Sequence, residues 1–158
     1  VEVTEDTVMI DRPASLATLQ RLRDLGVQVS VDDYGTGRAS LSYIRDLPIT
    51  ELKLDRIFLE GVPADAHNAA IVRSTIELAH ALGLPLVAEG VEDAGALAWL
   101  GDLGCDLAQG FHIARPLSRA DLMSWLRTRR DAASLVGDSS EPRDAASVDD
   151  VSPSAVAR

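Results

Sequence analysis

Short apolar stretches alternate with longer amphipathic stretches along the chain, and this alternation restricts the possible fold more than any other feature of the sequence. In the clearest apolar stretch, Val27–Val31, every second residue is apolar, and Asp32, Asp33 and a Gly-Thr-Gly segment follow directly. Such a period of two is typical of a strand. The segments between successive strands are too long for hairpins, and strands joined by helical crossovers run parallel. The sequence therefore predicts an α/β fold with a parallel sheet.

The bounds of the expected elements follow from the periodicity of apolar residues and from helix start and stop signals. Strands are expected at 1–3, 27–31, 51–55, 85–88 and 105–108, and helices at 13–25, 40–47, 68–82, 93–103 and from 118 to about 125. The helix at 68–82 has Asn68 as its expected N-cap. Its expected packing face consists of Ile71, Thr75, Leu78 and Leu82. The expected N-caps of the last two helices are Asp93 and Ser118, the latter in a capping box with Asp121, and the expected helix stops are Gly26, Gly83 and Gly104.

Polar residues stand at or near the carboxyl ends of the successive predicted strands. They are Glu2, Asp32 with Asp33, Lys53 with Asp55, Glu89 and Gln109. In parallel α/β folds the active site forms at this edge of the sheet, and in a (β/α)8 barrel all such ends meet at one mouth. A single acidic turn is ordinary in any protein. Five consecutive strand ends that carry such side chains indicate a functional site.

This set of side chains favours a hard divalent metal ion. Carboxylate and amide oxygens suit Mg²⁺ or Mn²⁺, and the three histidines lack the mutual spacing of zinc ligands. Two ions about 3.5–4 Å apart can activate a water and stabilise an in-line phosphoryl displacement, with Lys53 beside the water or a phosphate oxygen. The residues alone leave three readings open: a two-metal phosphodiesterase, an enolase-like lyase with Lys53 as its base, and a ligand-binding barrel without activity.

Charge and composition narrow the possible partners and locations. The formal net charge of −10 disfavours a nucleic-acid polymer, because phosphate binding requires a basic surface. No apolar run reaches the length of a membrane span, and the single cysteine, Cys105, fits a reducing cytoplasm. Residues 131–158 are rich in Ala, Ser, Asp and Pro and are expected to form a disordered acidic tail. The start at Val1, without Met or a signal pattern, suggests that the chain is a fragment of a parent protein. The sequence leaves open whether that parent is anchored to a membrane.

Five motifs, in their order and spacing, resemble those of the EAL-domain family. They are Val1–Glu5, Asp32–Gly37, Leu47–Pro48 with Leu52–Arg56, Ala88–Glu92, and Gln109–Phe111 with Arg115–Leu117. Members of this family are cyclic di-GMP phosphodiesterases built on a modified TIM barrel. The resemblance runs from Val1 to about Trp125. It implies that residues 1–130 are the C-terminal part of an EAL domain, with about the last five strands of a TIM-like (β/α)8 barrel.

The resemblance also implies a role for each matching position. The implied metal ligands are Glu2, Asp32, Asp33 and Glu89, and the implied catalytic residues are Lys53 and Glu89. The positions implied to lie near the substrate are Asp55, Glu92 and Gln109, and those implied to position the loop are Glu5, Gly35, Thr36 and Gly37. Family members cut cyclic di-GMP to linear pGpG with two Mg²⁺ or Mn²⁺ ions, and their loop after the aspartate pair leads to a homodimer interface.

The chain departs from the family pattern in two places. The Glu-Ala/Val-Leu signature and an asparagine on the next strand would lie before Val1, so two metal ligands and roughly the first half of the barrel are expected to be missing. Arg38 and Ala39 replace the usual aromatic residue and Ser. The expected function is therefore cyclic di-GMP hydrolysis in the parent protein, with little activity in this stretch alone, because an incomplete barrel exposes sheet edges. The alternative is a degenerate domain that binds cyclic di-GMP or serves only as an interaction module.

Overall fold

The structure is a computed structural model that describes residues 1–36 and 41–137, without the side chains of residues 5, 9, 41–43 and 130–137. The chain divides into two compact units, Val1–Pro116 and Leu117–Arg158, and each is described by itself. None of the helices in the described part of the chain is long and apolar enough to cross a membrane.

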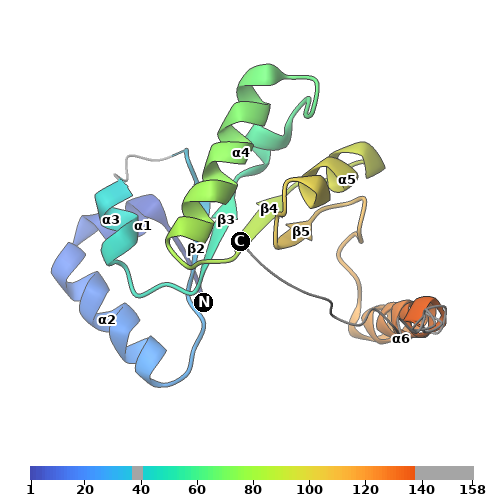
Figure 1. The fold of residues 1–158 in the computed structure, drawn as a ribbon. Helices are drawn as coiled ribbons and strands as arrows, with labels where there is room; N and C mark the ends of the chain where they lie inside the picture. Colours follow the sequence, from blue (N-terminus) through green and yellow to red (C-terminus); the bar gives the residue numbers. More distant parts are fainter. Residues whose placement is uncertain (37–40, 138–158) are drawn as a thin grey trace, which may run out of the picture. The chain divides into compact units, whose positions relative to one another are not determined.

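The first unit is built on a five-stranded parallel sheet with the strand order β1-β2-β3-β4-β5 (Figure 1). The strands are β1 (Glu2–Thr4), β2 (Ser30–Tyr34), β3 (Glu51–Leu54), β4 (Leu86–Glu89) and β5 (Leu107–Gln109). Each strand pairs with the next one along the chain, as in the wall of a (β/α)8 barrel. The predicted parallel α/β fold is confirmed, and the carboxyl ends of the five strands share one edge of the sheet.

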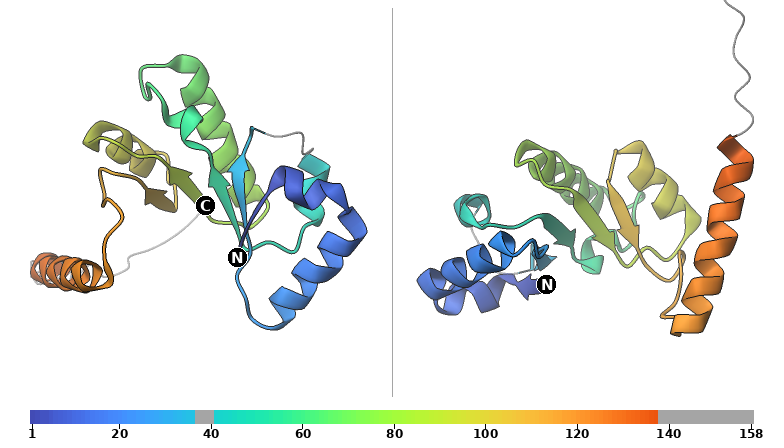
Figure 2. Two further views of the ribbon diagram at one scale, coloured as in Figure 1. Left: turned by 180° about the vertical axis from the view of Figure 1, so that it is seen from behind. Right: turned by 90° about the horizontal axis from the view of Figure 1, so that it is seen from below.

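Helices connect the strands and follow the sheet in chain order. They are α1 (Glu5–Ile10), α2 (Arg12–Asp24), α3 (Leu41–Asp46), the 3₁₀ helix η1 (Arg56–Leu59), α4 (Ala66–Ala81) and α5 (Ala94–Asp102). Both views in Figure 2 place α2 near the β1 end of the sheet and α5 near the β5 end. Helix α1 was not expected from the sequence. The predicted glycine stops are confirmed, since Gly26, Gly83 and Gly104 have φ of 79°, 71° and 77°.

The second unit contains helix α6 (Arg119–Gly137). One half of the predicted capping box is confirmed, since the backbone N–H of Asp121 donates to Ser118 Oγ at 3.3 Å. The Asp121 carboxylate accepts the Ser118 hydroxyl at 2.7 Å, whereas a full capping box would have it accept the backbone N–H of Ser118. The helix continues past Arg130, where the acidic tail was expected to begin. Residues 138–158 of that expected tail lie outside the described residues.

Helix α4 corrects two sequence predictions. It begins earlier than expected because Asp65, not Asn68, is its N-cap: the Asp65 carboxylate accepts the N–H of His67 at 2.8 Å and of Asn68 at 3.0 Å. The buried residues of α4 are Val72, Thr75, Ile76 and Ala79, whereas Ile71 is 40% exposed. Thr75 is buried as predicted and Leu82 packs against the core, but the rest of the packing face is rotated from the predicted one. The residues that become buried depend on where the sheet lies and not on periodicity alone.

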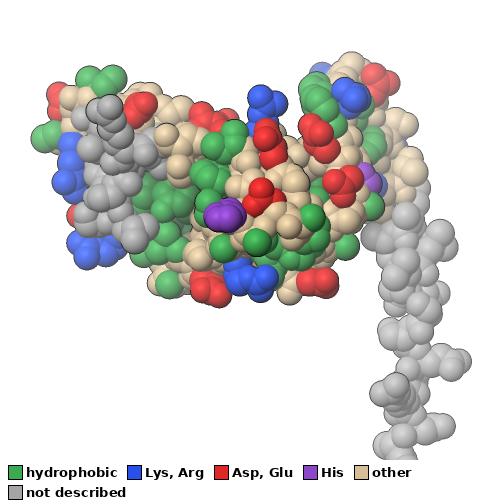
Figure 3. All heavy atoms as spheres, turned by 90° about the horizontal axis from the view of Figure 1, so that it is seen from above, with side chains coloured by type: hydrophobic (Ala, Val, Ile, Leu, Met, Phe, Trp, Pro, Cys, Tyr) green, Lys and Arg blue, Asp and Glu red, His purple; other side chains and the backbone are tan. Residues whose placement is uncertain are grey.

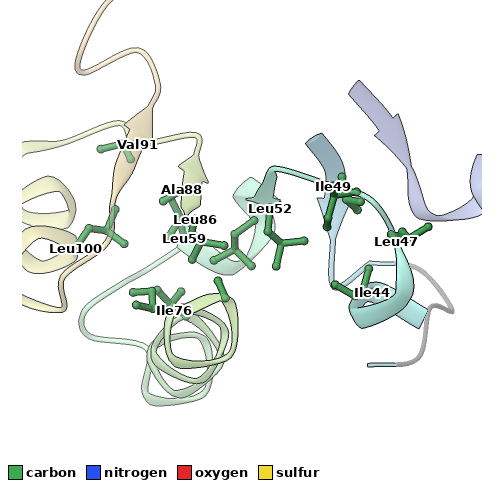
Figure 4. Close-up of a cluster of buried hydrophobic side chains, with 14 of the residues drawn as sticks. Ile44, Leu47, Ile49, Leu52, Leu59, Ile76, Leu86, Ala88, Val91 and Leu100 are labelled. Atoms are coloured by element: carbon green, nitrogen blue, oxygen red, sulfur yellow. The ribbon is translucent and has the colours of Figure 1, made fainter. Parts of the chain in front are cut away.

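The core of the first unit lies between the sheet and its helices (Figure 4). Leu52 and Leu54 on β3 and Leu86 on β4 are fully buried, and Ile76 of α4 and Leu100 of α5 pack into the same cluster. Full burial of one such side chain contributes about 1.5–3 kcal/mol. The middle strands are therefore held firmly, and the side chains at their carboxyl ends have a rigid support.

Candidate metal centre

A buried lysine joins carboxylates from three different strands. Lys53, on the central strand β3, is only 5% exposed. Its Nζ lies 2.9 Å from Glu2 Oε1, 3.3 Å from Asp32 Oδ1 and 2.5 Å from Glu89 Oε1. Figure 3 views the molecule from above and shows several Asp and Glu side chains on this face. Residues that are up to 87 positions apart in the sequence therefore form one polar cluster.

The protonation state of Lys53 is set by these carboxylates. Burial alone would lower the pKa of the lysine, because water no longer solvates the ammonium. Hydrogen bonds to Glu89 and Glu2, with the charges of Glu89 and Asp32, outweigh burial and raise the pKa above its ordinary value. Lys53 is therefore an ammonium that acts as an internal counter-ion of the acidic cluster.

An irregular backbone brings the two neighbouring aspartates to the same site. Val31 pairs with Leu52 and Tyr34 with Leu54, so β2 advances three residues while β3 advances two. Successive side chains of a regular strand point to opposite faces, and a bulge of one extra residue re-aims one of them. Asp33 has a φ of 55° and is the one non-glycine residue with positive φ in the described part of the chain. The bulge explains how both carboxylates face one centre.

Three carboxylates are close enough to share a cation. One oxygen each of Asp32, Asp33 and Glu89 lies within 4.8 Å of the others. Burial, a side-chain hydrogen bond with Asp55 and the nearby negative charges together raise the pKa of Asp33. The negative charges around Asp33 thus oppose its ionisation, and a divalent cation among the three carboxylates would remove this repulsion. Because all three donors are oxygens, the set fits a hard divalent ion and not a typical zinc site.

The two aspartates and the three residues after them, here called the aspartate loop (residues 32–36), are joined by hydrogen bonds within the loop. The N–H of Asp33 donates to Asp32 Oδ1 at 3.1 Å. The N–H and the hydroxyl of Thr36 both donate to the carbonyl of Asp33, at 3.2 Å and 2.9 Å. Gly37, Arg38, Ala39 and the side chain of Glu5 lie outside the described residues, so the roles expected of them stay predictions.

The remaining predicted site residues lie beside this centre. Gln109 on β5 pairs in register with Glu89 on β4, and both line a cavity of about 200 Å³ together with Glu92. Asp55 follows β3 and accepts the N–H of Ile57 at 2.8 Å. The structure therefore brings all the described members of the predicted site to one edge of the sheet, without testing their roles.

Two residues of this region, Arg56 and Phe111, belong to the family motifs but were given no role from the sequence. Arg56 lines both the 200 Å³ cavity and a neighbouring cavity of about 360 Å³, and Glu92 lines both as well. The ring of Phe111 lines the smaller cavity, with the guanidinium of Arg115 stacked 4.4 Å from the ring centroid. The signal for Arg56 was its place directly after Asp55 at the end of a strand. Arg56 gives both cavities a positive charge among acidic neighbours, and Phe111 gives the smaller cavity an aromatic ring on which a flat ring of a ligand could stack.

Fold and centre together define a parallel α/β domain with a carboxylate-rich site for divalent ions, and comparison with known proteins gives its family. The EAL domain family matches residues 1–116, and the chain belongs to this family. It is 46% identical over 134 residues to the cyclic di-GMP phosphodiesterase NbdA of Pseudomonas aeruginosa, a match that covers 84% of this chain and 17% of NbdA.

Solved structures of the family show a similar fold. The MucR phosphodiesterase in complex with cyclic di-GMP has a TM-score of 0.72 at 45% identity, covering 77% of this chain and 49% of that chain. The Klebsiella pneumoniae protein BlrP1, solved with manganese and cyclic di-GMP, has a TM-score of 0.67 at 33% identity, covering 73% of this chain and 29% of that chain. The five strands are therefore part of a TIM-barrel-like domain, and the chain spans less than one fifth of NbdA and half of the solved MucR chain.

Proposed function

We propose that the EAL domain to which this chain belongs hydrolyses cyclic di-GMP to linear pGpG with two Mg²⁺ or Mn²⁺ ions. The observation that carries the proposal is the meeting of Asp32, Asp33 and Glu89 around Lys53. The names of relatives support the substrate, since NbdA is a cyclic di-GMP phosphodiesterase and the MucR structure holds cyclic di-GMP. BlrP1 supports a divalent ion.

The carboxylates of Asp32, Asp33 and Glu89, with Glu2 beside them, would hold the ions. When bound, the ions supply positive charge to the phosphodiester and lower the pKa of water, which is the chemistry of two-metal hydrolysis. The bulge in β2 fixes the direction of the two aspartates before any ligand arrives. Preorganised charges of this kind need no rearrangement during the reaction.

Lys53 orients the reacting groups in this proposal. Its ammonium donates toward three carboxylates from a buried position, so it adjoins the place where water and a phosphate oxygen would meet. Glu89 contacts the same ammonium and would contact the water. Hydrolysis then places a water oxygen on phosphorus as the bond to one 3′ oxygen breaks, and that oxygen takes up a proton.

The substrate would extend from the carboxylates into the cavities beside them. Arg56 supplies positive charge there, while Glu92 and Gln109 offer hydrogen-bonding groups for a guanosine. We further propose a homodimer as the assembly of the complete domain, and the cytoplasm as its location, which agrees with the single thiol of Cys105.

Two alternatives receive less support. A receptor that does not cut cyclic di-GMP has no need of a buried lysine among three carboxylates. A lyase with Lys53 as base is disfavoured by the family match over residues 1–116. Among the described residues, β1 and β5 each pair with a strand on one side only. Because the sheet is open, we propose that the 158-residue chain alone turns over little substrate.

The test is hydrolysis of cyclic di-GMP by the complete domain, with pGpG separated by chromatography. Asp32→Ala and Glu89→Ala are each expected to abolish pGpG formation, and a chelator is expected to do the same. Asp102→Ala, at an exposed carboxylate at the end of α5, is the matched control and should leave the rate unchanged. Turnover that survives both site variants would overturn the proposal, and robust turnover by residues 1–158 would overturn its statement about this chain.

A further inference from the structure

The aromatic ring of Phe58 presses against the backbone of the aspartate loop. Gly35 has a φ of +97°, and a Cβ added there would lie 2.7 Å from Phe58 Cε2 and 3.1 Å from Phe58 Cζ. The ring thus occupies the space that a side chain at position 35 would take. Phe58 comes from η1, after β3, whereas Gly35 directly follows the bulged strand β2. The two elements meet through this contact.

The loop has an unfavourable backbone that needs support. Asp33 adopts a left-handed conformation that non-glycine residues rarely take, and it does so inside a bulge. Such conformations persist only where the surroundings hold them. The hydrogen bonds of Thr36 to the Asp33 carbonyl lie within the loop and cannot fix the loop relative to the sheet. The ring of Phe58 is a contact from outside the loop.

Phe58 is itself held in place. The Asp55 carboxylate accepts the N–H of Ile57 at 2.8 Å and so caps η1. The side-chain amide of Asn68, in the first turn of α4, donates to the carbonyls of Ile57 at 3.3 Å and Glu60 at 2.9 Å. The ring also packs against the hydrophobic core. The contact with Gly35 therefore joins the loop to a fixed support.

We propose that Phe58 is a positioning residue, which holds the aspartate loop in the one conformation that aims Asp32 and Asp33 at a common metal ion. The metal part of this inference rests on the proposed function, whereas the loop part rests on the contact alone. Phe58 touches neither substrate nor metal in this account. It acts through Gly35 on the two ligands.

The first test measures amide hydrogen exchange of Thr36 by NMR in the 158-residue chain. Phe58→Ala is expected to raise the exchange rate of this amide about tenfold, because the loop opens more often once one of its contacts with the rest of the domain is gone. Phe58→Leu, which keeps part of the apolar contact, should fall between wild type and Phe58→Ala. Leu59→Ala is the control: Leu59 is a buried core residue on the same 3₁₀ helix, so it lowers the melting temperature without touching the loop. Thr36 exchange that is unchanged in Phe58→Ala, or raised as much in Leu59→Ala, would overturn the proposal.

The second test separates the ring contact from backbone strain. Gly35→Ala and Gly83→Ala both place a Cβ at positive φ, but nothing lies within 4 Å of a Cβ at position 83. Gly35→Ala is therefore expected to lower the melting temperature more than Gly83→Ala. In a Phe58→Ala background the Cβ at position 35 has room, so the difference between the two losses of melting temperature should shrink. A difference of the same size in wild type and in Phe58→Ala would refute the contact.

The third test reads the metal ligands directly. Mn²⁺ broadens NMR signals near its site, and the Mn²⁺ concentration at half broadening of Thr36 is expected to rise about tenfold or more in Phe58→Ala, a loss of about 1.4 kcal/mol in binding. Phe58→Leu should restore part of the affinity, and Leu59→Ala should not change it. Equal affinity in wild type and Phe58→Ala would overturn the positioning role. If wild type binds no Mn²⁺, the metal site proposed for this chain fails, while the exchange test of the loop still decides the contact between Phe58 and Gly35, and hydrolysis by the complete domain still decides the proposed function.

Discussion

Replacing Lys53 by Met tests whether this ammonium is the counter-ion of the acidic cluster. Met preserves an unbranched apolar chain of similar length but removes the charge that Glu2, Asp32 and Glu89 share. Removal of one partner from a buried ion pair costs about 3–5 kcal/mol. The side chains of Asp32 and Glu89 are 23% and 20% exposed, so water can solvate part of the remaining charge, and we expect a loss of about 3 kcal/mol, at the lower end of that range.

Urea denaturation with a chelator present measures this loss as a change in the free energy of unfolding. Arg45→Met is the matched control, because the ion pair of Arg45 with Asp46 is 67% and 42% exposed and should contribute under about 1 kcal/mol. Added Mg²⁺ should narrow the deficit of Lys53→Met, since a cation among the carboxylates takes over the role of the ammonium. A loss no larger than that of Arg45→Met would refute the counter-ion argument. A deficit that Mg²⁺ leaves unchanged would refute the metal site.

Three further predictions concern single side chains, each measured by urea denaturation. Asp33→Asn should raise the free energy of unfolding at pH 7. The pKa of Asp33 is raised, so the protonated carboxyl stabilises the fold below the ordinary value of 3.8, and this stabilisation is lost as pH rises through the folded value. Asn carries no charge at any pH and so avoids this loss. A less stable variant would contradict this. Gly110→Ala should cost about 3 kcal/mol, because its Cβ would overlap the backbone of Val91, whereas Gly101→Ala in helix α5, where the Cβ meets nothing, should be neutral or gain about 0.5–1 kcal/mol. Asp106→Asn should lower the free energy of unfolding at pH 7, the opposite of Asp33→Asn. A backbone hydrogen bond lowers the pKa of Asp106, so its contribution is present above 3.8 and is lost as pH falls through the folded value; with a side chain 37% exposed, it is worth no more than about 1 kcal/mol. Equal acid sensitivity of wild type and Asp106→Asn would contradict this assignment.

Helix α4 shows how far local patterns predict the fold. The recurrence of apolar residues was enough to predict a helix that ends before Gly83, because an amphipathic stripe and a left-handed stop are local features. The first turn was placed too late, since Asp65 and Ala66 add nothing to the apolar pattern and Asn68 is itself a good capping residue. Whether Asn68 caps α4 or bonds η1 depends on the position of η1 in space. The sequence around Asn68 does not predict where η1 lies.

The metal centre shows the same division. Carboxylates at successive strand ends could be predicted to meet, because a parallel sheet brings all those ends to one edge. The bulge that turns Asp32 and Asp33 toward each other could not be predicted, because it is defined by the pairing of β2 with β3, which lies further along the chain. The contact between Phe58 and Gly35 is hidden for the same reason: Gly-Thr-Gly indicates a tight loop, and only the folded chain shows which ring requires the glycine.

The central claim is that Asp32, Asp33 and Glu89 bind a divalent ion, and Mn²⁺ electron paramagnetic resonance tests it most directly. The spectrum of free Mn²⁺ loses amplitude when the ion binds, so titration with the 158-residue chain counts binding at this site. The account predicts that the wild-type chain lowers the amplitude, that Asp32→Asn and Glu89→Gln each restore it, and that Asp102→Asn does not. An amplitude that the wild-type chain leaves unchanged, or that both site variants lower as much as wild type does, would contradict the account.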